Sequence, residues 1–124
     1  MNSSEQVLFI DDDESIREFV TMALNDEGYD VLTAHNGAIG LETLRTATPG
    51  LILLDMRMPI MDGWTFLKRY MATPAPHVPV IALTASRSTT ENNVPSEVSD
   101  FLAKPFELGE LIEIVGRYLR PAHN

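Results

Sequence analysis

Four short runs of apolar residues divide the chain, and a polar side chain follows each of them. The runs and their polar ends are 7–10 with Asp11, 51–54 with Asp55, 80–83 with Thr84, and 101–103 with Lys104. Apolar runs of this length, separated by helical patterns, are typical of buried parallel strands. Because ligands bind at the carboxyl ends of the strands in an open α/β sheet, these polar side chains are predicted to share one site.

The stretches between the runs repeat apolar residues at helical spacing. The first extends from Ile16 to Leu24, and Gly28 can end a helix there. Asn36 and Asp62 have side chains that cap helix N-termini, so two further helices are expected after them. The helix after Asn36 is expected to turn three side chains inward: Ala38, Leu41 and Leu44. The last helix carries one apolar stripe, made of Leu108, Leu111, Ile112, Val115 and Leu119.

The helical pattern fails between residues 86 and 99, where the alternation calls for a fourth helix. Few residues there are apolar and Pro95 interrupts them, so this helix is predicted to be short, irregular or mobile. With a short second strand at 31–32, the pattern predicts an α/β fold. We expect a doubly wound, five-stranded parallel sheet of flavodoxin-like order 2-1-3-4-5, with about five helices.

Composition narrows the classes of partner and site. The length of 124 residues predicts one domain, residues 1–124 with its core at 6–120. The net charge of −9 argues against direct binding of nucleic acid or of an anionic membrane. The absence of cysteine excludes disulfides and thiolate metal sites. No apolar stretch is long enough for a signal peptide or a membrane span, so a cytoplasmic protein is expected.

The predicted strand order gives the polar strand ends a specific chemistry. Asp11, Asp12 and Asp55 would lie close together, and three neighbouring carboxylates cannot all stay ionised without a cation. Lys104 supplies one positive charge, and a single Mg²⁺ would balance the remaining two negative charges. Carboxylate, water and phosphate oxygens are the ligands that Mg²⁺ selects. Histidine ligands for zinc are not suggested, because the histidines are scattered at His35, His77 and His123.

The same residues are suited to phosphoryl transfer. A carboxylate whose charge is partly neutralised by Mg²⁺ can attack phosphorus and become an acyl phosphate. The transition state spreads negative charge over three equatorial oxygens. Mg²⁺, the Lys104 ammonium and the Thr84 hydroxyl offer one partner for each oxygen. The sequence therefore predicts a phosphoryl acceptor.

At this point the chain resembles the receiver domain of two-component response regulators, from Val7 to Leu119. The resemblance rests on four motifs in a fixed order: Ile10-Asp11-Asp12 with Ile16-Arg17, Leu54-Asp55-Met56-Arg57-Met58-Pro59 with Asp62-Gly63, Leu83-Thr84-Ala85, and Lys104-Pro105-Phe106. Each motif alone is weak evidence. Together and in this order they are specific to the CheY-like superfamily.

The resemblance implies that Asp55 accepts a phosphoryl group from a sensor histidine kinase or a histidine phosphotransfer protein. It implies that Mg²⁺, with Mn²⁺ as a substitute, is bound by Asp12, Asp55 and the backbone carbonyl of Arg57, and by Asp11 mainly through a water. Thr84 and Lys104 would contact the phosphoryl oxygens, and the peptide bond from Lys104 to Pro105 would be cis.

The resemblance also implies a switch rather than an enzyme with an external substrate. Phosphorylation would draw Thr84 toward the phosphate and turn Phe101 inward, which changes the surface around strands 4 and 5 and the last helix for a downstream protein target. The receiver itself would catalyse its phosphorylation and dephosphorylation. Arg57 and Ser86, each two residues beyond a site residue, occupy positions that vary among relatives. We hypothesise that Arg57 modulates dephosphorylation by lying over the site.

Two other functions are compatible with parts of the pattern. The run Asp11 to Ser15 fits the opening motif of haloacid-dehalogenase-like phosphatases, with Asp11 as nucleophile and Asp13 as acid/base. Those enzymes need a further acidic pair after the lysine strand, and here Glu107, Glu110 and Glu113 follow along a helix instead. An interaction module that keeps the fold without the chemistry is the other alternative, and the presence of all five site residues argues against it.

Overall fold

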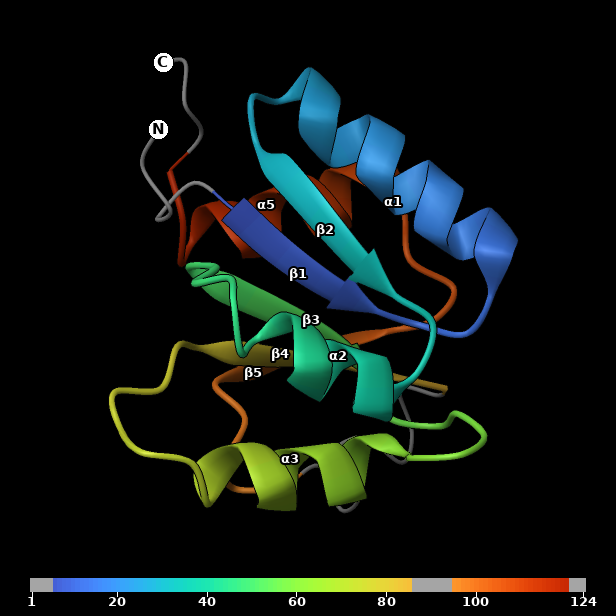
Figure 1. Ribbon diagram of the computed structural model, residues 1–124. Coiled ribbons are helices and arrows are strands. Elements are labelled where there is room, and N and C mark those ends of the chain that lie inside the picture. Colours follow the sequence, from blue (N-terminus) through green and yellow to red (C-terminus); the bar gives the residue numbers. More distant parts are fainter. Residues whose placement is uncertain (1–5, 86–94, 121–124) are drawn as a thin grey trace.

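Five parallel strands form the sheet of the computed structural model, which describes residues 6–85 and 95–120. The strands are β1 (Gln6–Ile10), β2 (Asp30–Ala34), β3 (Leu51–Asp55), β4 (Val80–Thr84) and β5 (Asp100–Ala103). Their order is β2-β1-β3-β4-β5, and all four pairings are parallel. The flavodoxin-like order predicted from the sequence is therefore confirmed (Figure 1).

Four helices are present in the part of the chain that the structure describes. They are α1 (Glu14–Asp26), α2 (Gly37–Thr43), α3 (Gly63–Met71) and α5 (Leu108–Gly116). Helices α1 and α5 cover one face of the sheet, and α2 and α3 cover the other (Figure 1). Residues 95–99 form a turn and a bend rather than a helix, and the rest of the predicted irregular segment, 86–94, lies outside the described residues.

Side-chain caps fix where three of the helices begin. Asp13 accepts a hydrogen bond from the N–H of Ile16 at 3.1 Å and thereby caps α1. Asn36 caps α2 and Asp62 caps α3 by the same geometry, each at 2.9 Å. These caps satisfy backbone donors that a helix leaves unpaired in its first turn. The predicted roles of Asn36 and Asp62 are confirmed.

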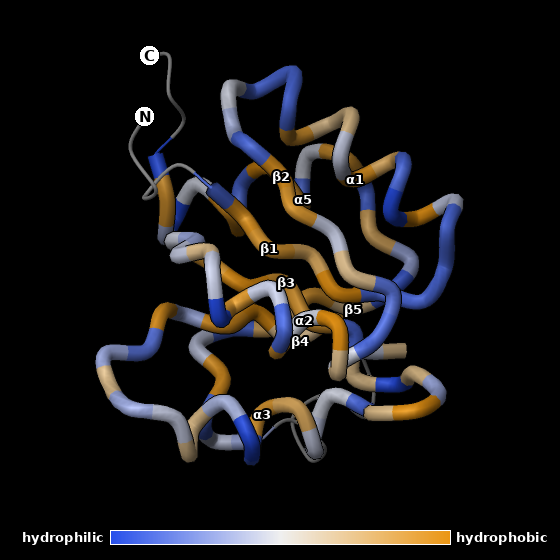
Figure 2. Tube along the Cα trace, in the orientation of Figure 1, coloured by the Kyte–Doolittle hydropathy of each residue, from blue (hydrophilic) through white to orange (hydrophobic). Residues whose placement is uncertain are grey.

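The sheet separates two hydrophobic layers. In β1, Val7 and Phe9 pack with α1 and α5, whereas Leu8 and Ile10 pack with α2 and α3. Side chains of a strand alternate between the two faces, so a strand buried on both sides must be apolar throughout. Figure 2 shows the apolar residues running through the central strands, whereas polar and apolar residues alternate along the helices.

Two details of the predicted helix faces are wrong. Ala38 is exposed, because α2 turns Gly37 and Gly40 toward the sheet instead. A Cβ at Gly40 would lie 2.5 Å from Cδ1 of Ile10, so the backbone of α2 approaches β1 more closely than a side chain permits. Leu108 is 47% exposed at the start of α5, while Ile114, which the predicted stripe omitted, is buried.

Gly63 permits a second close approach, between α3 and the end of β3. Its N–H donates to the carbonyl of Met56 at 3.0 Å, and a Cβ there would lie 2.7 Å from Cα of Met56. The substitution Gly63→Ala should therefore lower the free energy of unfolding by about 1–3 kcal/mol, the usual cost of overpacking. Chemical denaturation of the two proteins measures this difference.

Gly109 provides a matched control for that substitution. A Cβ at Gly109 meets no atom within 4 Å, and the residue is exposed in the first turn of α5. Gly109→Ala should be neutral or stabilise the protein by up to about 1 kcal/mol, because Ala has the higher helix propensity. Equal losses of stability at both positions would show that the close approach at Gly63 is not what matters.

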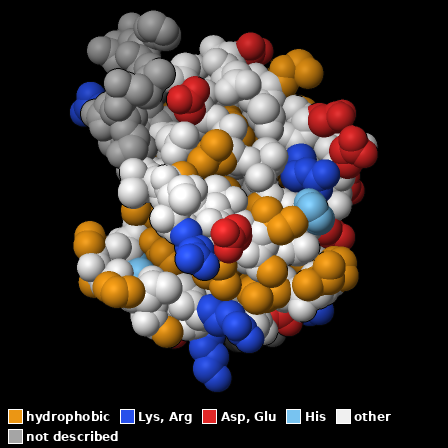
Figure 3. Space-filling model, in the orientation of Figure 1, with side chains coloured by type: hydrophobic (Ala, Val, Ile, Leu, Met, Phe, Trp, Pro, Cys, Tyr) orange, Lys and Arg blue, Asp and Glu red, His pale blue; other side chains and the backbone are white. Residues whose placement is uncertain are grey.

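Charged side chains are distributed unevenly between the two faces of the sheet. Acidic side chains gather over α1, and Lys and Arg side chains gather over the α2 and α3 side (Figure 3).

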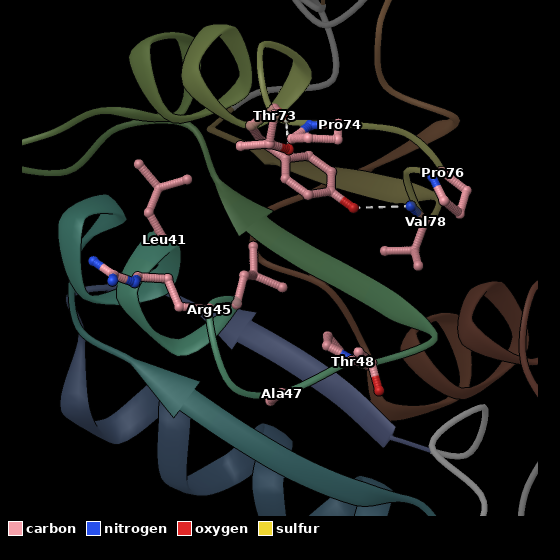
Figure 4. A pocket seen from close by; sticks show the side chains of 11 residues that line it. Leu41, Arg45, Ala47, Thr48, Thr73, Pro74, Pro76 and Val78 are labelled. Atoms are coloured by element: carbon pink, nitrogen blue, oxygen red, sulfur yellow. Dashed lines mark hydrogen bonds between the residues drawn. The ribbon is translucent and has the colours of Figure 1, made fainter.

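A cavity of about 510 Å³ lies at the amino ends of β3 and β4, between Leu44, Pro49, Tyr70 and Val78. Figure 4 shows this apolar cavity, where the Tyr70 hydroxyl accepts a hydrogen bond from the N–H of Val78 at 2.9 Å. None of the helices in the described ranges is long and apolar enough to cross a membrane.

Candidate functional site

The carboxyl ends of the strands bring the predicted polar residues to one edge of the sheet. Ile10 lies opposite Leu54 in the parallel register, so the aspartates after β1 lie beside Asp55 at the end of β3. Thr84 ends β4, and its backbone carbonyl accepts a hydrogen bond of 2.6 Å from the N–H of Lys104, which follows β5. The four strand ends thus form a single cleft, at the opposite edge from the apolar cavity.

Three aspartates form the acidic part of this cleft. One carboxylate oxygen from each of Asp11, Asp12 and Asp55 lies within 4.8 Å of the others. Asp11 is fully buried, Asp55 is 6% exposed, and Asp12 faces solvent. The carboxyl groups predicted to be neighbours are therefore neighbours, and they share one end of the sheet.

The donor set fits a hard divalent cation. The three carboxylates offer only oxygen ligands, and Asp12 keeps one side of the cluster open to solvent. Hard cations such as Mg²⁺ prefer oxygen ligands and retain several waters, which an open side accommodates. With a single ammonium nearby, two negative charges remain unbalanced when all three carboxyl groups are ionised. Such a cluster favours a divalent cation on charge as well as on ligand type.

Lys104 bridges the two buried carboxylates. Its Nζ lies 2.9 Å from Oδ2 of Asp11 and 3.4 Å from Oδ2 of Asp55. Burial alone would lower the pKa of Lys104, but the hydrogen bond and the charges of Asp11 and Asp55 outweigh it and raise this pKa above its usual value. Lys104 is therefore held as a cation in direct contact with Asp55.

Thr84 contributes a buried hydroxyl with an unused hydrogen-bonding capacity. Among the described residues, its Oγ1 is buried and has no hydrogen-bond partner. A buried hydroxyl without a partner is costly, and such groups in native proteins call for an explanation in terms of function or of a missing ligand. Because Thr84 ends the strand next to Asp55, an anionic group on Asp55 is a suitable acceptor for this hydroxyl.

The environment of Asp55 displaces its pKa. The pKa of this carboxyl is raised from 3.8 to about 6, chiefly by burial and then by the charge of Asp11. The ammonium of Lys104 and the N–H of Arg57, 3.3 Å from Oδ1 of Asp55, act in the opposite direction. A carboxyl group whose charged form is destabilised gains from any cation or covalent group that reduces its charge.

Arg17 holds the site through a contact that the sequence does not signal. The guanidinium of Arg17 donates to the backbone carbonyl of Asp11 at 2.8 Å, and the N–H of Asp13 donates to Oδ1 of Asp11 at 2.9 Å. A spacing of six residues between Asp11 and Arg17 gives no local signal of this bond. The carboxylate of Asp13 caps α1, so it is committed to the helix rather than to acid/base chemistry.

The loop between β3 and α3 lies beside the cleft and contains a strained turn. Ile60 has φ of 72°, a value that β-branched residues rarely adopt, and the N–H of Met61 donates to the carbonyl of Pro59 at 2.7 Å across it. Arg57 belongs to the lining of the cleft. Its guanidinium carbon lies 5.7 Å from the centre of the Trp64 ring. A strained backbone persists only where the surrounding structure holds it in place, and such residues are common at functional sites.

The remaining predicted residues lie close to the cleft. The peptide bond from Lys104 to Pro105 is cis, as predicted, and so is the bond from Ala75 to Pro76, which was not predicted. Phe101 lies on β5 opposite Ala82, with 39% of its surface exposed. Ser86 lies outside the described residues.

A sequence comparison identifies one family for nearly the whole described chain. Residues 7–116 match the family described as the response regulator receiver domain. Response regulator MprA of Mycobacterium ulcerans (strain Agy99) is 34% identical over 119 residues, which cover 94% of this chain and 51% of that protein. The chain therefore spans about half the length of the curated relatives it matches.

Solved structures agree with the sequence comparison. A CheY-like response regulator receiver domain protein from Methanospirillum hungatei JF-1 has a TM-score of 0.83 and 28% identity, with 94% of each chain covered. Response regulator TrrA from Thermotoga maritima, solved in complex with Mg²⁺ and BeF, also has a TM-score of 0.83 and 28% identity. That match covers 93% of this chain and 99% of TrrA.

Proposed function

This chain belongs to the response regulator receiver domain family, and on that premise we propose that Asp55 accepts a phosphoryl group from a phosphohistidine. Receiver domains are phosphoacceptor signalling switches rather than classical enzymes. The phosphohistidine would be carried by a sensor histidine kinase or a histidine phosphotransfer protein. The observation that supports this proposal best is the contact of Asp55 with Lys104, next to two further aspartates and a buried hydroxyl that has no partner among the described residues.

The transfer is a displacement at phosphorus. One carboxylate oxygen of Asp55 forms a bond to phosphorus, and the bond from phosphorus to the imidazole nitrogen breaks. The electron pair of that bond stays on the nitrogen, so no redox step is involved. Hydrolysis reverses the modification, because a water oxygen bonds to phosphorus and the electron pair of the broken bond returns to the Asp55 carboxylate.

Lys104 and Thr84 are assigned to the phosphoryl oxygens. The ammonium of Lys104 is 3.4 Å from Oδ2 of Asp55 and can stay close when the carboxylate becomes an acyl phosphate. The Thr84 hydroxyl, which has no partner among the described residues, can donate to a second phosphoryl oxygen. Fixed donors aimed at developing negative charge are the main source of rate acceleration in such sites.

Mg²⁺, with Mn²⁺ as a substitute, is the cation that the donor set fits. We assign Asp12, Asp55 and the backbone carbonyl of Arg57 as direct ligands, and Asp11 as a ligand mainly through water. When bound, the cation supplies positive charge that reduces repulsion between the carboxylates and the incoming phosphoryl group. Asp11 also holds Lys104 in place through its 2.9 Å contact, and that role does not depend on the metal.

Thr84 and Phe101 form the proposed switch. If Thr84 moves toward the phosphoryl group, it vacates space near β5, and the half-exposed ring of Phe101 can then turn inward. The surface that changes lies around β4, β5 and α5, and its partner is a downstream protein. Direct contact with nucleic acid or membranes stays outside this proposal, because the net charge of the chain is −9.

Intact-mass spectrometry after incubation with acetyl phosphate and Mg²⁺ tests the proposed acceptor. The wild-type protein should gain one phosphoryl group, and Asp55→Asn should gain none. Asp30→Asn is the matched control, because it removes an exposed carboxylate at the opposite end of the sheet. Mapping the label to Asp11 would instead support a phosphatase-like mechanism, and no label on any protein would support an interaction module without phosphoryl chemistry.

A further inference from the structure

Arg57 has two environments within reach, and the structure shows its side chain in one of them. Its backbone N–H donates to Oδ1 of Asp55, so the residue is anchored at the edge of the cleft. Its guanidinium lies over the face of Trp64, 5.7 Å from the ring centre. A guanidinium at this distance from an indole ring forms a cation–π contact.

The first turn of α3 places Trp64 beside the cleft. This helix begins at the Asp62 cap, and the neighbouring Gly63 packs directly on the backbone of Met56. Because Met56 lies between Asp55 and Arg57 in the chain, the close approach at Gly63 fixes the backbone at Trp64 relative to the cleft. The Trp64 side chain is exposed, at 37%, so one face of the ring is open to the guanidinium.

The cleft competes with Trp64 for the same guanidinium. It is lined by the carboxylates of Asp12, Asp13 and Asp55, which outnumber the single ammonium of Lys104 there, and by Arg57 itself. A phosphoryl group on Asp55 would add further negative charge and would attract the long, flexible cation more strongly. The side chain of Arg57 is exposed and is therefore free to leave the indole at small cost.

We propose that Trp64 is a positioning residue that holds Arg57 away from Asp55 and thereby sets the lifetime of the phosphorylated state. This inference rests on the proposed function of Asp55. In the released position, the guanidinium lies over the phosphoryl group and occupies the space through which water approaches phosphorus. Hydrolysis then proceeds mainly from the form in which Arg57 is stacked on Trp64, and weaker stacking slows it.

Fluorescence tests the contact itself, without any phosphorylation. Trp64 is the single tryptophan of the chain, so all indole emission comes from this residue. Arg57→Ala should change its emission intensity and its quenching by iodide, because the ring loses the stacked cation. Arg69→Ala removes another exposed cation of α3 and is the control, which should leave the emission unchanged. Identical emission spectra for wild type and Arg57→Ala would overturn the stacking.

Phosphate loss tests the consequence. After labelling with acetyl phosphate and removal of the donor, Trp64→Leu should lengthen the phosphoryl half-life about two- to fivefold, the range expected when an exposed cation–π contact is lost. Trp64→Phe keeps an aromatic face and should give an intermediate half-life. Arg57→Ala should shorten the half-life, since the shielding cation is gone.

The double variant separates positioning from a general effect on α3. Trp64→Leu with Arg57→Ala should decay at the rate of Arg57→Ala alone, because Trp64 acts only through Arg57. The proposal would be overturned if the double variant kept its phosphoryl group longer than Arg57→Ala alone. An unchanged half-life in Trp64→Leu would also overturn it. If the wild-type protein takes up no phosphoryl group at all, the proposed function of Asp55 fails instead, and the fluorescence result still decides whether Trp64 holds Arg57.

Discussion

Replacing Asp55 with Asn should make the metal-free protein more stable at neutral pH, by up to about 3 kcal/mol. The pKa of Asp55 is raised from 3.8 to about 6, chiefly by burial and then by the charge of Asp11. Each unit of such a shift corresponds to about 1.4 kcal/mol of difference between the charged and neutral forms. Asn resembles the neutral form, so the substitution removes the cost of keeping a buried carboxylate ionised. The carboxylate of Asp55 therefore costs stability in the metal-free protein, which is the cost of the role proposed for it.

The same shift sets the direction of the pH dependence. A carboxyl group with a raised pKa in the folded state binds more protons than it does in the unfolded state between pH 3.8 and about 6. Its contribution to stability is therefore complete below that window and is lost as the pH rises through it. The stability advantage of Asp55→Asn over wild type should accordingly grow from pH 4 to pH 7.

Denaturant unfolding at a series of pH values, with chelator present, measures this advantage. Asp30→Asn, which removes an exposed carboxylate at the start of β2, should show no comparable gain. Added Mg²⁺ should stabilise wild type more than Asp55→Asn, because the variant lacks one carboxylate of the cluster. If Asp55→Asn is less stable than wild type at pH 7 and gains equally from Mg²⁺, the buried charge of Asp55 does not destabilise the protein.

Replacing Lys104 with Met should slow the phosphorylation of Asp55 by about 10²- to 10³-fold. A loss of this size is usual when one fixed donor to a developing anion is removed. Lys104 is the one ammonium that contacts both Asp11 and Asp55 in the described residues, at 2.9 and 3.4 Å. Met fills a similar volume without the charge, so the variant also leaves the buried carboxylate of Asp11 without its cation.

The rate of phosphoryl uptake from acetyl phosphate, followed by intact mass, measures the effect. Lys104→Arg keeps the positive charge and should retain part of the rate, although the larger guanidinium cannot reproduce both contacts. Unfolding curves for the same variants show whether the protein remains folded. A folded Lys104→Met protein that is phosphorylated as fast as wild type would remove Lys104 from the proposed mechanism.

Local signals explain most of what was predicted correctly. Runs of apolar residues specify strands that are buried on both faces, and Asn36 and Asp62 specify helix starts because a cap needs only its own next few residues. The alternation of these elements then restricts the sheet to a few orders, and the observed order is the predicted one. The grouping of Asp11, Asp12, Asp55 and Lys104 follows from that order, since each lies at or just after the carboxyl end of a strand.

Close approaches between distant segments explain what was predicted wrongly or not at all. The sequence alone determined the strands, the capped helices and which polar residues share an edge. Only the tertiary structure decided that Gly40 rather than Ala38 faces β1, that Gly63 brings α3 onto Met56, and that Trp64 stacks with Arg57. It also decided the raised pKa of Asp55, which depends on burial. Strand and cap signals act over a few residues, whereas packing distance and desolvation depend on atoms from segments far apart in the chain.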